Sequence, residues 1–521
     1  MKYQVALIFG IALVSRFAGA VTCENLTTLS TAEMKVTLAA VVSSSGSAAQ
    51  LPPDIGTLPP FCRVAATLTP SPDSAIRIEV WMPISGWNGK YEGTGNGGFA
   101  GGIDLGALAA GLRRGYAVAN TDMGTAPPSG GDADALIGHP EKWLDWGTRS
   151  THEMTLAAKK IVAAFYASAP RHSYFVGCST GGEQGLMEAQ RFPDDYDGIV
   201  AGAPANNRTH LHIEILWDSV VSTRDAGSTI PPDKLSLITH AALKACPESK
   251  AVLSDDFFSY DPSACHWDPQ SLVCKADGAS QCLTQEQATT ARDLYQGPID
   301  PVTHQAIYPG VPLGSEFGWS ALGPKDDQPP FASLFKWVFG SDWNFRAFDF
   351  SRDVSLMDTR LAQMLNATNP DLTAFKARGN KLIVYHGWAD WLVPPQESIN
   401  YYEQVANAQA KAARSHHRVK EEETNDFYRL FMIPGMSHCA GGPGLNTVNV
   451  IDSIESWVET GVAPAKIDAA RVDNGATSMT RPVCPYPQTA RYLGTGDTAN
   501  ASSFSCSNSN QSSARTDSLP R

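Results

Sequence analysis

The sequence has little positive charge and few long hydrophobic runs, and each shortage excludes a class of function. Its 521 residues include 40 Lys and Arg against 53 Asp and Glu, a net charge of −13 with neutral histidines. Proteins that bind nucleic acids neutralise phosphates mainly with Lys and Arg, so we predict no nucleic-acid partner. After the first twenty residues no long apolar run follows, so we predict no membrane-spanning segment.

The first apolar run is typical of a secretory signal. Lys2 supplies the charged start, residues 5–14 the apolar core, and residues 18–20 a small-residue cleavage site. We therefore expect residues 1–20 to be removed and the mature protein to be secreted and extracellular. Without Lys2 and Arg16 the balance becomes 38 basic against 53 acidic residues, a net charge of −15. In a secreted eukaryotic protein, five sequons would accept surface glycans: Asn25, Asn207, Asn366, Asn500 and Asn510.

Metal-binding cysteine patterns are also missing. None of the ten cysteines forms a Cys-x-x-Cys pair, so the sequence predicts no zinc site. An even number in a secreted chain favours five disulfides instead. Proximity along the chain suggests four pairs and leaves Cys178 for Cys439. The four are Cys23–Cys62, Cys246–Cys265, Cys274–Cys282 and Cys484–Cys506.

The main catalytic signal is a Gly-x-Ser-x-Gly pattern centred on Ser179. A short apolar run precedes it at residues 174–176, and a helix-favouring stretch follows at 183–190. This strand–turn–helix context is that of a nucleophile elbow, which exposes the serine hydroxyl beside a helix N-terminus that favours negative charge. The pattern also occurs by chance in ordinary tight turns, but its flanks favour the catalytic interpretation.

Strand and helix patterns alternate on both sides of this elbow. They predict an α/β fold with a parallel sheet covered on both faces. A helix is expected from a capping box of Ser150 and Glu153, and residues 21–72 are expected to be irregular. The predicted strands are 75–81, 116–120, 173–176, 198–202, 381–387 and 428–433.

The alternation stops after Pro204. Residues 205–372 carry four cysteines and many prolines, and strand–helix alternation resumes at residue 381. We therefore expect an α/β-hydrolase core, formed by residues 21–204 and 373–521, with a large inserted lid domain at 205–372. The insertion would lie over the carboxyl edge of the sheet, where ligands bind in such folds.

A serine nucleophile needs a base, and the base needs an orienting carboxylate. In α/β-hydrolases the chain order is Ser, then Asp or Glu, then His. Asp390 and His438 each follow a predicted strand, which places both in loops at the same sheet edge as Ser179. His386 is the main rival for the base. We assign it a structural role, because it precedes Asp390 in the same loop and is not expected to face it.

Two cysteines adjoin these candidates. Cys178 precedes the serine and Cys439 follows the histidine. If Ser179 and His438 are within hydrogen-bond reach, their neighbours fall within bridging distance, and a disulfide would tie nucleophile to base. The rival interpretation, Cys178 as a thiolate nucleophile, would expose a reactive thiol in an oxidising compartment and leave the serine without a purpose. Two unrelated structural cysteines are the remaining alternative.

These residues resemble the tannase and feruloyl esterase family of secreted α/β-hydrolases, which is marked by a Cys-Ser … Asp … His-Cys arrangement with bridging cysteines. The resemblance covers nearly the whole mature chain. The matching segments are 177–182, 191–199, 201–205, 387–390 and 435–439, together with 87–90 and 95–98 in a glycine-rich loop.

The resemblance implies a role for each matching residue. Ser179 would be the nucleophile, His438 the general base and then acid, and Asp390 its orienting carboxylate. The backbone N–H groups of Thr180 and of Gly97 or Gly98 would form the oxyanion hole. A glycine run after a strand also occurs as a flexible turn. The assignment of Gly97 or Gly98 as the second oxyanion donor therefore relies on the serine elbow downstream.

The family's inserted segment usually binds a structural calcium between two cysteines. Here Lys250 stands where a carboxylate ligand is expected, and calcium needs several oxygen ligands. The sequence therefore argues against calcium in the lid, and no metal or other cofactor is expected for catalysis. Glu183 also departs from the basic residue common after the serine motif.

The resemblance implies a secreted serine esterase that cleaves hydroxycinnamoyl esters, such as feruloyl esters of plant cell-wall material, through an acyl-enzyme. Its expected partners are small aromatic esters, attached to polysaccharide in some cases. A tannase acting on gallate esters, a non-catalytic binding protein and a peptidase are the alternatives. Aromatic residues of the inserted segment are candidates to hold the aryl group: Phe257, Phe258, Tyr260, Trp319, Trp337 and Trp343.

Overall fold

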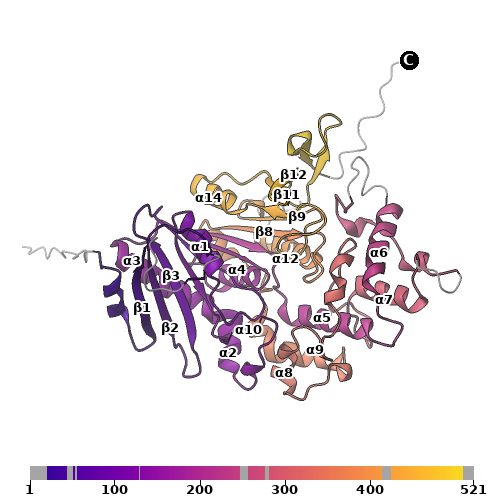
Figure 1. Cartoon of the computed structure of the whole chain (residues 1–521), viewed down its shortest axis with the longest axis horizontal. Coiled ribbons are helices and arrows are strands. Elements are labelled where there is room, and N and C mark those ends of the chain that lie inside the picture. Colours follow the sequence, from indigo (N-terminus) through magenta and orange to yellow (C-terminus); the bar gives the residue numbers. More distant parts are fainter. Residues whose placement is uncertain are drawn as a thin grey trace, which may run out of the picture.

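A nine-stranded sheet forms the centre of the molecule (Figure 1). The computed structural model describes residues 20–43, 51–52, 55–127, 130–246, 256–275, 281–412 and 424–508. In spatial order the strands are β1 (Met34–Val42), β2 (Phe61–Leu68), β3 (Ile76–Pro83), β5 (Ala117–Thr121), β4 (Lys90–Thr94), β6 (His172–Cys178), β7 (Gly198–Gly202), β8 (Lys381–Gly387) and β9 (Tyr428–Ile433).

The sheet is antiparallel at its N-terminal edge and parallel elsewhere. Strands β1, β2, β3 and β5 pair antiparallel, whereas β5, β4, β6, β7, β8 and β9 pair parallel. The expectation that residues 21–72 are irregular is wrong, because β1 and β2 occupy much of this range. Buried residues alternate with more accessible ones along most of both strands, and Met34 pairs with Leu68 at one end of the ladder.

Helices cover both faces of the parallel part, as the sequence predicts for an α/β fold. Successive residues on one strand enter different apolar clusters: Phe175 packs with α3 (Ser150–Tyr166), α4 (Thr180–Arg191) and α12 (Gln396–Ala412), whereas Tyr174 packs with α14 (Ile451–Thr460). The pleat sends neighbouring side chains to opposite faces, so burial on both faces requires apolar residues at consecutive positions. Helix α1 (Leu105–Arg113) packs beside β3 and β5.

The predicted capping box at Ser150 does not form. Helix α2 (Pro140–Leu144) runs through a π-helical turn at Asp145–Arg149 directly into α3, and Arg149 makes no side-chain cap. Ser150 therefore lies inside a continuous helical segment. Because its N–H is already within helical backbone, the reciprocal bonds of a capping box have no free N-terminus to satisfy.

Residues 205–372 are mainly helical where they are described. The first helix, α5, begins soon after β7 at the carboxyl edge, and its apolar side packs against the core: Ile213 and Leu216 share a cluster with Phe99 and Trp146. The boundaries 204/205 and 372/373 stay predictions. The α-helices are α5 (Arg208–Ser222), α6 (Pro232–Ala245), α7 (Gln285–Gln296), α8 (Ser333–Phe339), α9 (Arg352–Met357) and α10 (Gln363–Leu365), and α11 (Thr373–Ala377) follows this segment.

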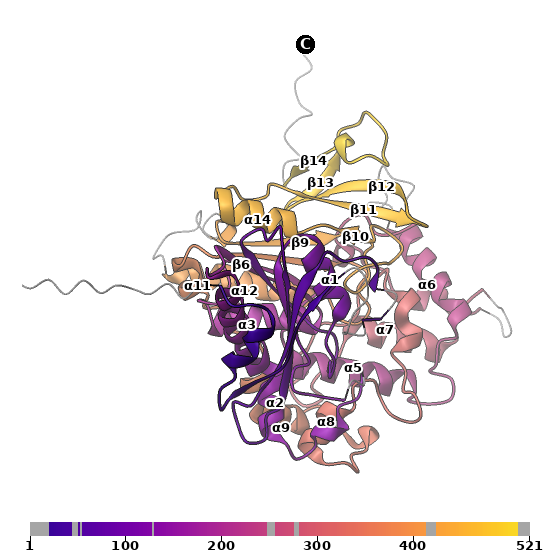
Figure 2. The same ribbon diagram turned by 60° about the vertical axis from the view of Figure 1, so that its left-hand side comes forward.

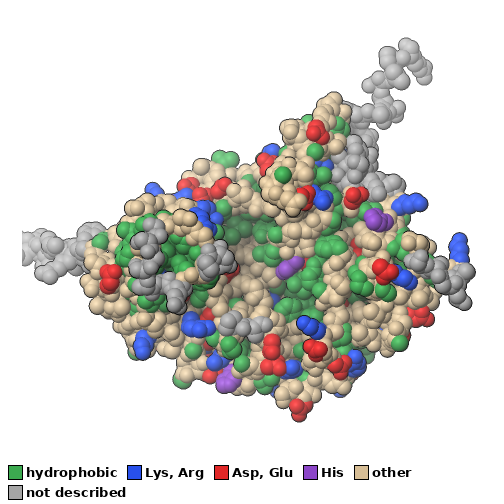
Figure 3. Space-filling model, in the orientation of Figure 1, with side chains coloured by type: hydrophobic (Ala, Val, Ile, Leu, Met, Phe, Trp, Pro, Cys, Tyr) green, Lys and Arg blue, Asp and Glu red, His purple; other side chains and the backbone are tan. Residues whose placement is uncertain are grey.

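Two small sheets lie near α14 and β9, and all their strands except β10 follow α14 in the chain (Figures 1 and 2). An isolated bridge between Phe431 and Pro485 joins β9 to the C-terminal segment. Figure 3 shows hydrophobic side chains gathered near the middle of the face seen in Figure 1. The additional strands are β10 (Thr447–Val448), β11 (Ile467–Asp473), β12 (Ala476–Val483), β13 (Thr489–Tyr492) and β14 (Phe504–Ser507).

All five predicted disulfides are present. The four between nearby cysteines form as expected, and Cys178 bonds to Cys439. In the described part of the chain, no helix combines the length and the apolar character needed to cross a bilayer. Three expectations lie wholly or largely outside the described residues: the signal at 1–20, the calcium segment at 246–256 and the sequon at Asn510.

One sequon is engaged inside the fold. The Asn366 amide donates to Asn207 Oδ1 at 3.2 Å and to Thr209 Oγ1 at 3.0 Å, and its oxygen accepts from Thr209 N at 3.1 Å. A glycan on this amide nitrogen would break these bonds, so the structure argues against Asn366 as an acceptor. Asn25 and Asn500, in contrast, are exposed.

Removal of the Cys178–Cys439 disulfide should lower the free energy of unfolding more than removal of Cys484–Cys506. The first closes a loop of 261 residues and the second a loop of 22. Loop-closure entropy gives about 5.6 and about 3.4 kcal/mol respectively. Urea unfolding of the two double alanine variants measures both losses, and a larger loss for the shorter loop would contradict this account.

Candidate active site

Ser179 occupies a strained turn between β6 and α4. Its backbone has φ 64° and ψ −119°, a region that residues with side chains rarely adopt. Its N–H donates to Gly202 O at 2.9 Å, which anchors the turn to β7. The elbow predicted from the sequence therefore forms, and Thr180 begins the helix behind it, where backbone N–H groups have no partner within the helix.

Glycines allow the elbow to meet the glycine-rich loop after β4. A Cβ atom on Gly95 would lie 2.5 Å from Gly181 Cα, and one on Gly177 would lie 2.5 Å from Gly181 O. The Gly181 N–H donates to Asn96 O at 2.7 Å across this contact. Any larger residue at these positions would separate the serine from the loop that resembles an oxyanion loop.

Asp390 and His438 meet at the carboxyl ends of β8 and β9. His438 Nδ1 lies 2.7 Å from Asp390 Oδ2, and the other carboxylate oxygen accepts from the N–H groups of Leu392 and Val393. Asp390 is fully buried, which works to raise its pKa, but His438 and His386 outweigh burial and hold that pKa well below its usual value. The carboxylate is therefore charged and orients the His438 ring.

The expectation that His386 does not face Asp390 is wrong. His386 Nε2 lies 3.1 Å from Asp390 Oδ2 and 2.9 Å from Val393 O. Both neighbours can only accept, so Nε2 carries the proton and Nδ1 accepts from Ser398 Oγ at 2.7 Å. His386 is fully buried, and both ring nitrogens are occupied, so it supports Asp390 and has no free nitrogen to act as a base.

The Cys178–Cys439 disulfide brings Ser179 close to the Asp390–His438 pair. Cys178 and Cys439 have Cα atoms 5.8 Å apart, and each adjoins one reactive candidate, Ser179 or His438. Among the described residues Ser179 Oγ and His438 form no hydrogen bond with each other. Such bonds are often long without substrate and shorten in the reacting complex. His438 Nε2 remains available, because Asp390 is bound to Nδ1.

The loop with Gly97 and Gly98 is held against the elbow through one carbonyl. Gly98 O accepts from Thr180 Oγ1 at 3.0 Å and from Trp146 Nε1 at 3.4 Å. Gly98 has φ 53°, and an added Cβ would lie 2.5 Å from Gly130 O. An added Cβ on Gly97 would meet nothing within 4 Å, so this residue faces open space beside the serine loop.

Sequence reasoning missed Arg208, which lies beneath this network. Its guanidinium donates to Thr180 Oγ1 at 3.1 Å and lies 4.8 Å from the Trp146 ring centroid, so it contacts both donors to Gly98 O. It also pairs with buried Glu183 at 3.4 Å. The signal in the sequence was the unusual Glu183, because a buried carboxylate after the serine motif needs a nearby cation.

One group of three side chains in the described chain has metal-ligand spacing. His152, Glu188 and Asp195 offer donor atoms within 4.8 Å of one another, on the α3–α4 side of the sheet. Burial and the neighbouring Asp195 raise the pKa of Glu188 well above its usual value. The raised pKa favours the neutral form of Glu188, and His152 Nδ1 lies 2.6 Å from Asp195 Oδ2.

Most of the aromatic residues expected to hold an aryl group are core residues. Phe257, Phe258, Trp319 and Trp337 are at most 5% exposed. Trp337 stacks on Trp143, and Trp343 stacks on Phe335. Tyr260 differs, because its side chain lines a cavity.

The buried Glu183 carboxyl gives a testable pH dependence. Burial raises its pKa to about 8, and Arg208 only partly offsets the effect, against an ordinary value of 4.5. A raised pKa in the folded state stabilises the fold fully below pH 4.5, and this contribution is lost as the pH rises to about 8. We expect the unfolding free energy of the wild type, minus that of Glu183→Gln, to fall across this range. Urea unfolding at a series of pH values measures the difference, and parallel curves would contradict it.

Comparisons with known proteins place these features in a family. The sequence pattern of the tannase and feruloyl esterase family matches residues 62–328 and 339–507. An uncharacterised esterase of Xanthomonas campestris is 35% identical, over 95% of this chain and 92% of its own. A probable feruloyl esterase B-1 of Aspergillus flavus is 31% identical, over 85% of this chain and 86% of its own.

Solved structures agree with this assignment. Feruloyl esterase B from Aspergillus oryzae superimposes with a TM-score of 0.83 at 27% identity, covering 93% of this chain and 99% of its own. Tannin acyl hydrolase from Aspergillus niger shares the fold, with a TM-score of 0.75 at 22% identity over 91% of this chain and 92% of its own. The chain belongs to the tannase and feruloyl esterase family and is a carboxylic ester hydrolase.

Proposed function

We propose that this protein is a secreted serine esterase that cleaves hydroxycinnamoyl esters, such as feruloyl esters of plant cell-wall material. The observation that carries the proposal is the Asp390–His438 hydrogen bond of 2.7 Å, in a loop that the Cys178–Cys439 disulfide joins to the Ser179 elbow. The names of the Aspergillus relatives supply the substrate class, and the geometry of the site supports the roles proposed for its residues.

In the acylation half, His438 Nε2 removes the proton from Ser179 Oγ as the oxygen attacks the ester carbonyl. The resulting tetrahedral oxyanion is held by the N–H groups of Thr180 and of Gly97 or Gly98. Collapse expels the alcohol, which takes the proton from His438. Water then attacks the acyl-enzyme by the same route and releases the aromatic acid, which restores the serine hydroxyl.

Asp390 keeps His438 in the tautomer that this mechanism needs. Its Oδ2 receives Nδ1–H, so the lone pair on Nε2 faces the nucleophile, and its negative charge stabilises the imidazolium that forms. The carboxylate also accepts from His386 and from two backbone N–H groups, which fix its position. The low pKa of Asp390 means that it remains charged throughout the physiological pH range.

Arg208 would act as a positioning residue for the oxyanion hole. It contacts Thr180 and Trp146, and both of these donate to Gly98 O, so one guanidinium holds the two loops that supply the N–H groups. At neutral pH the raised pKa of Glu183 leaves that carboxyl largely protonated. The positive charge of Arg208 is then only partly neutralised close to the developing oxyanion.

In this proposal residues 205–372 form a lid over the catalytic edge, and no cofactor takes part in catalysis. Helix α5 supplies Arg208 from this segment, so the lid is part of the catalytic support as well as a cover. Gallate esters are the second candidate substrate, favoured by the shared fold with tannin acyl hydrolase. Both candidates require the same chemistry and differ only in the acyl group that the site accepts.

Parallel assays of methyl ferulate, methyl caffeate and methyl gallate test the proposal. We expect the highest kcat/KM for ferulate, and a loss of about 10⁵-fold or more in kcat for Ser179→Ala, which removes the nucleophile. Retention of activity in Ser179→Ala would overturn the mechanism. A preference for gallate would overturn the feruloyl assignment alone, and a wild type that turns over none of the esters would favour a non-catalytic binding protein.

Loss of the Arg208 guanidinium should lower the rate of catalysis more than it weakens substrate binding. Arg208→Met should lower kcat by about 10- to 100-fold with little change in KM, because positioning of oxyanion donors matters mainly in the transition state. Arg208→Lys should recover part of this loss, because lysine keeps the positive charge but cannot contact Thr180 and the Trp146 ring at the same time. The exposed Arg378→Met is the control. An equal effect of the control, or a change in KM alone, would contradict the role of Arg208.

A further inference from the structure

The two residues that follow Arg208 are anchored to another part of the inserted segment. Asp358 holds both with one carboxylate: Oδ1 accepts from Thr209 Oγ1 at 2.6 Å, and Oδ2 lies 2.9 Å from His210 Nε2. Asp358 begins a π-helical turn that leads into α10. This anchor holds the first turn of α5, from which the Arg208 guanidinium reaches Thr180.

The His210 ring has a hydrogen-bond acceptor at each nitrogen. Nδ1 lies 3.0 Å from Ile307 O, and Nε2 makes the contact with Asp358. A backbone carbonyl and a carboxylate can only accept, so both ring nitrogens must carry hydrogen for both bonds to form. Only the imidazolium, the charged form of His210, carries both hydrogens. A deprotonated ring has to give up one of the two bonds.

The surroundings of the ring favour this charged form. Burial works to lower the pKa of His210, but the Asp358 carboxylate, the Ile307 carbonyl and Glu397 outweigh it and raise that pKa above its ordinary value of 6.5. Burial works to raise the pKa of Asp358, but the contact with His210 reverses this and leaves that pKa below its usual value. Arg208 is the other charged residue of this turn, and its guanidinium is directed to the serine elbow.

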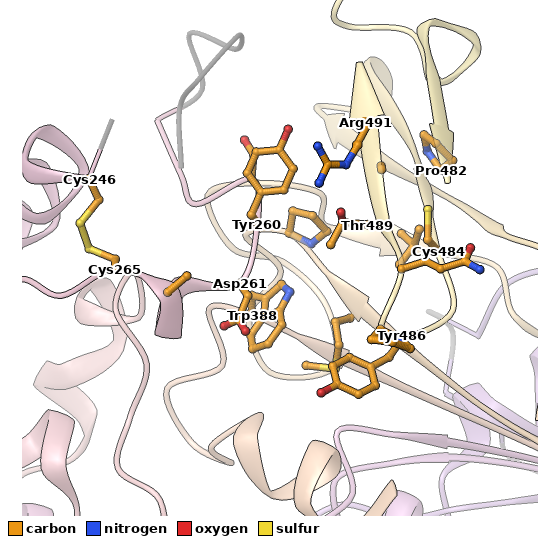
Figure 4. A pocket seen from close by; sticks show the side chains of 18 of the residues that line it. Cys246, Tyr260, Asp261, Cys265, Trp388, Pro482, Cys484, Tyr486, Thr489 and Arg491 are labelled. Carbon is orange, nitrogen blue, oxygen red and sulfur yellow. A yellow bond between two sulfur atoms is a disulfide. The ribbon is translucent and has the colours of Figure 1, made fainter. Parts of the chain in front are cut away.

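A small cavity connects the ring with solvent. The His210 side chain is 24% exposed and lines this cavity, whose volume is about 320 Å³. Besides Asp358, the titratable side chains that line it are Glu397 and Tyr401 of α12. None of its lining residues belongs to the larger cavity beside Tyr260, which Figure 4 shows between the inserted segment and the C-terminal strands. His210 can therefore exchange its proton with solvent without any change at that larger cavity.

We propose that His210 is a positioning residue for catalysis, whose protonated ring holds Arg208 in place beneath the oxyanion loops. We call its two bonds, to Asp358 and to Ile307 O, the His210 clamp. The inference rests on the proposed function, because the clamp acts on the reaction only through the Arg208 guanidinium. When the ring loses its proton, one bond is lost and the first turn of α5 is held less firmly. The N–H donors that Arg208 supports are then less well placed for the oxyanion, so the rate falls.

The variant Asp358→Asn separates this role from general support of the fold. An asparagine side chain offers an acceptor oxygen to Thr209 and an N–H donor to His210. A neutral His210 ring can then accept at Nε2 and still donate from Nδ1 to Ile307 O. Every bond of the clamp can form without the additional proton, so the clamp should stay closed at pH values that deprotonate the wild-type ring.

The pH dependence of kcat for methyl ferulate tests the proposal. From about pH 6 to about pH 9, the ratio of wild-type kcat to Asp358→Asn kcat should fall by about 3- to 10-fold, with little change in KM. Both chains keep Glu183 and His438, so the titration of those groups enters both profiles and cancels in the ratio. Asp73→Asn, which alters the exposed His139–Asp73 pair, is the matched control and should give a constant ratio.

A second variant removes the titrating group. His210→Gln has one amide nitrogen in place of two ring donors, so it can satisfy only one of the two acceptors. Its kcat should be about 3- to 10-fold below that of the wild type at the acidic end of the range and should approach it at the alkaline end. A constant ratio of wild-type to Asp358→Asn kcat, or wild-type kcat in His210→Gln at every pH, would overturn the role of His210.

Urea unfolding over the same pH range follows the clamp without catalysis. A raised pKa in the folded state stabilises the fold fully below pH 6.5, and this contribution is lost as the pH rises through the folded pKa. The unfolding free energy of the wild type, minus that of Asp358→Asn, should therefore fall as the pH rises. A fall with a constant kcat ratio would overturn the positioning role alone. A wild type that hydrolyses no ester would instead overturn the proposed function on which this role rests.

Discussion

The close contact of three backbone segments at Gly95, Gly177 and Gly181 is the constraint on which the catalytic site depends. A side chain at any of them would meet backbone atoms of a neighbour at 3.0 Å or less. The contact sets the strained turn at residue 179 against the loop after β4, and the Gly181–Asn96 hydrogen bond closes it. Parallel pairing of β4 with β6 brings both loops to one edge, so the sheet determines where the contact forms.

Much of this site could be predicted from the sequence because its signals are local and the topology is restrictive. The elbow has its own pattern, and parallel strands deliver their carboxyl-terminal loops to one edge, which brings Asp390 and His438 together. Cys178 and Cys439 were also informative because each is next in sequence to a catalytic candidate, Ser179 or His438. The pairing of the remaining cysteines followed from short separations, which need no knowledge of the fold.

Features that depend on packing across the chain were not predictable in this way. Arg208 reaches Thr180 only because α5 crosses the catalytic edge, a placement that no local pattern encodes. His386 faces Asp390 because the loop between them folds back toward Val393, so closeness in sequence gave the wrong answer. Strands β1 and β2 were missed because the proline pairs between them, at 52–53 and 59–60, suggested irregular structure. The false capping box at Ser150 has the right residues but lies inside a helix that begins earlier.

The segment between β7 and β8 leaves and returns to adjacent strands that pair in register, from Gly198 with Lys381 to Gly202 with Tyr385. Its length therefore places no strain on the sheet, and evolution or protein engineering can exchange it as a cassette while the catalytic frame persists. Ile213 and Leu216 form the apolar contact between this segment and Phe99 and Trp146. A replacement segment would have to reproduce this contact. Chimeras that keep this apolar contact offer a route to altered ester selectivity on an unchanged scaffold.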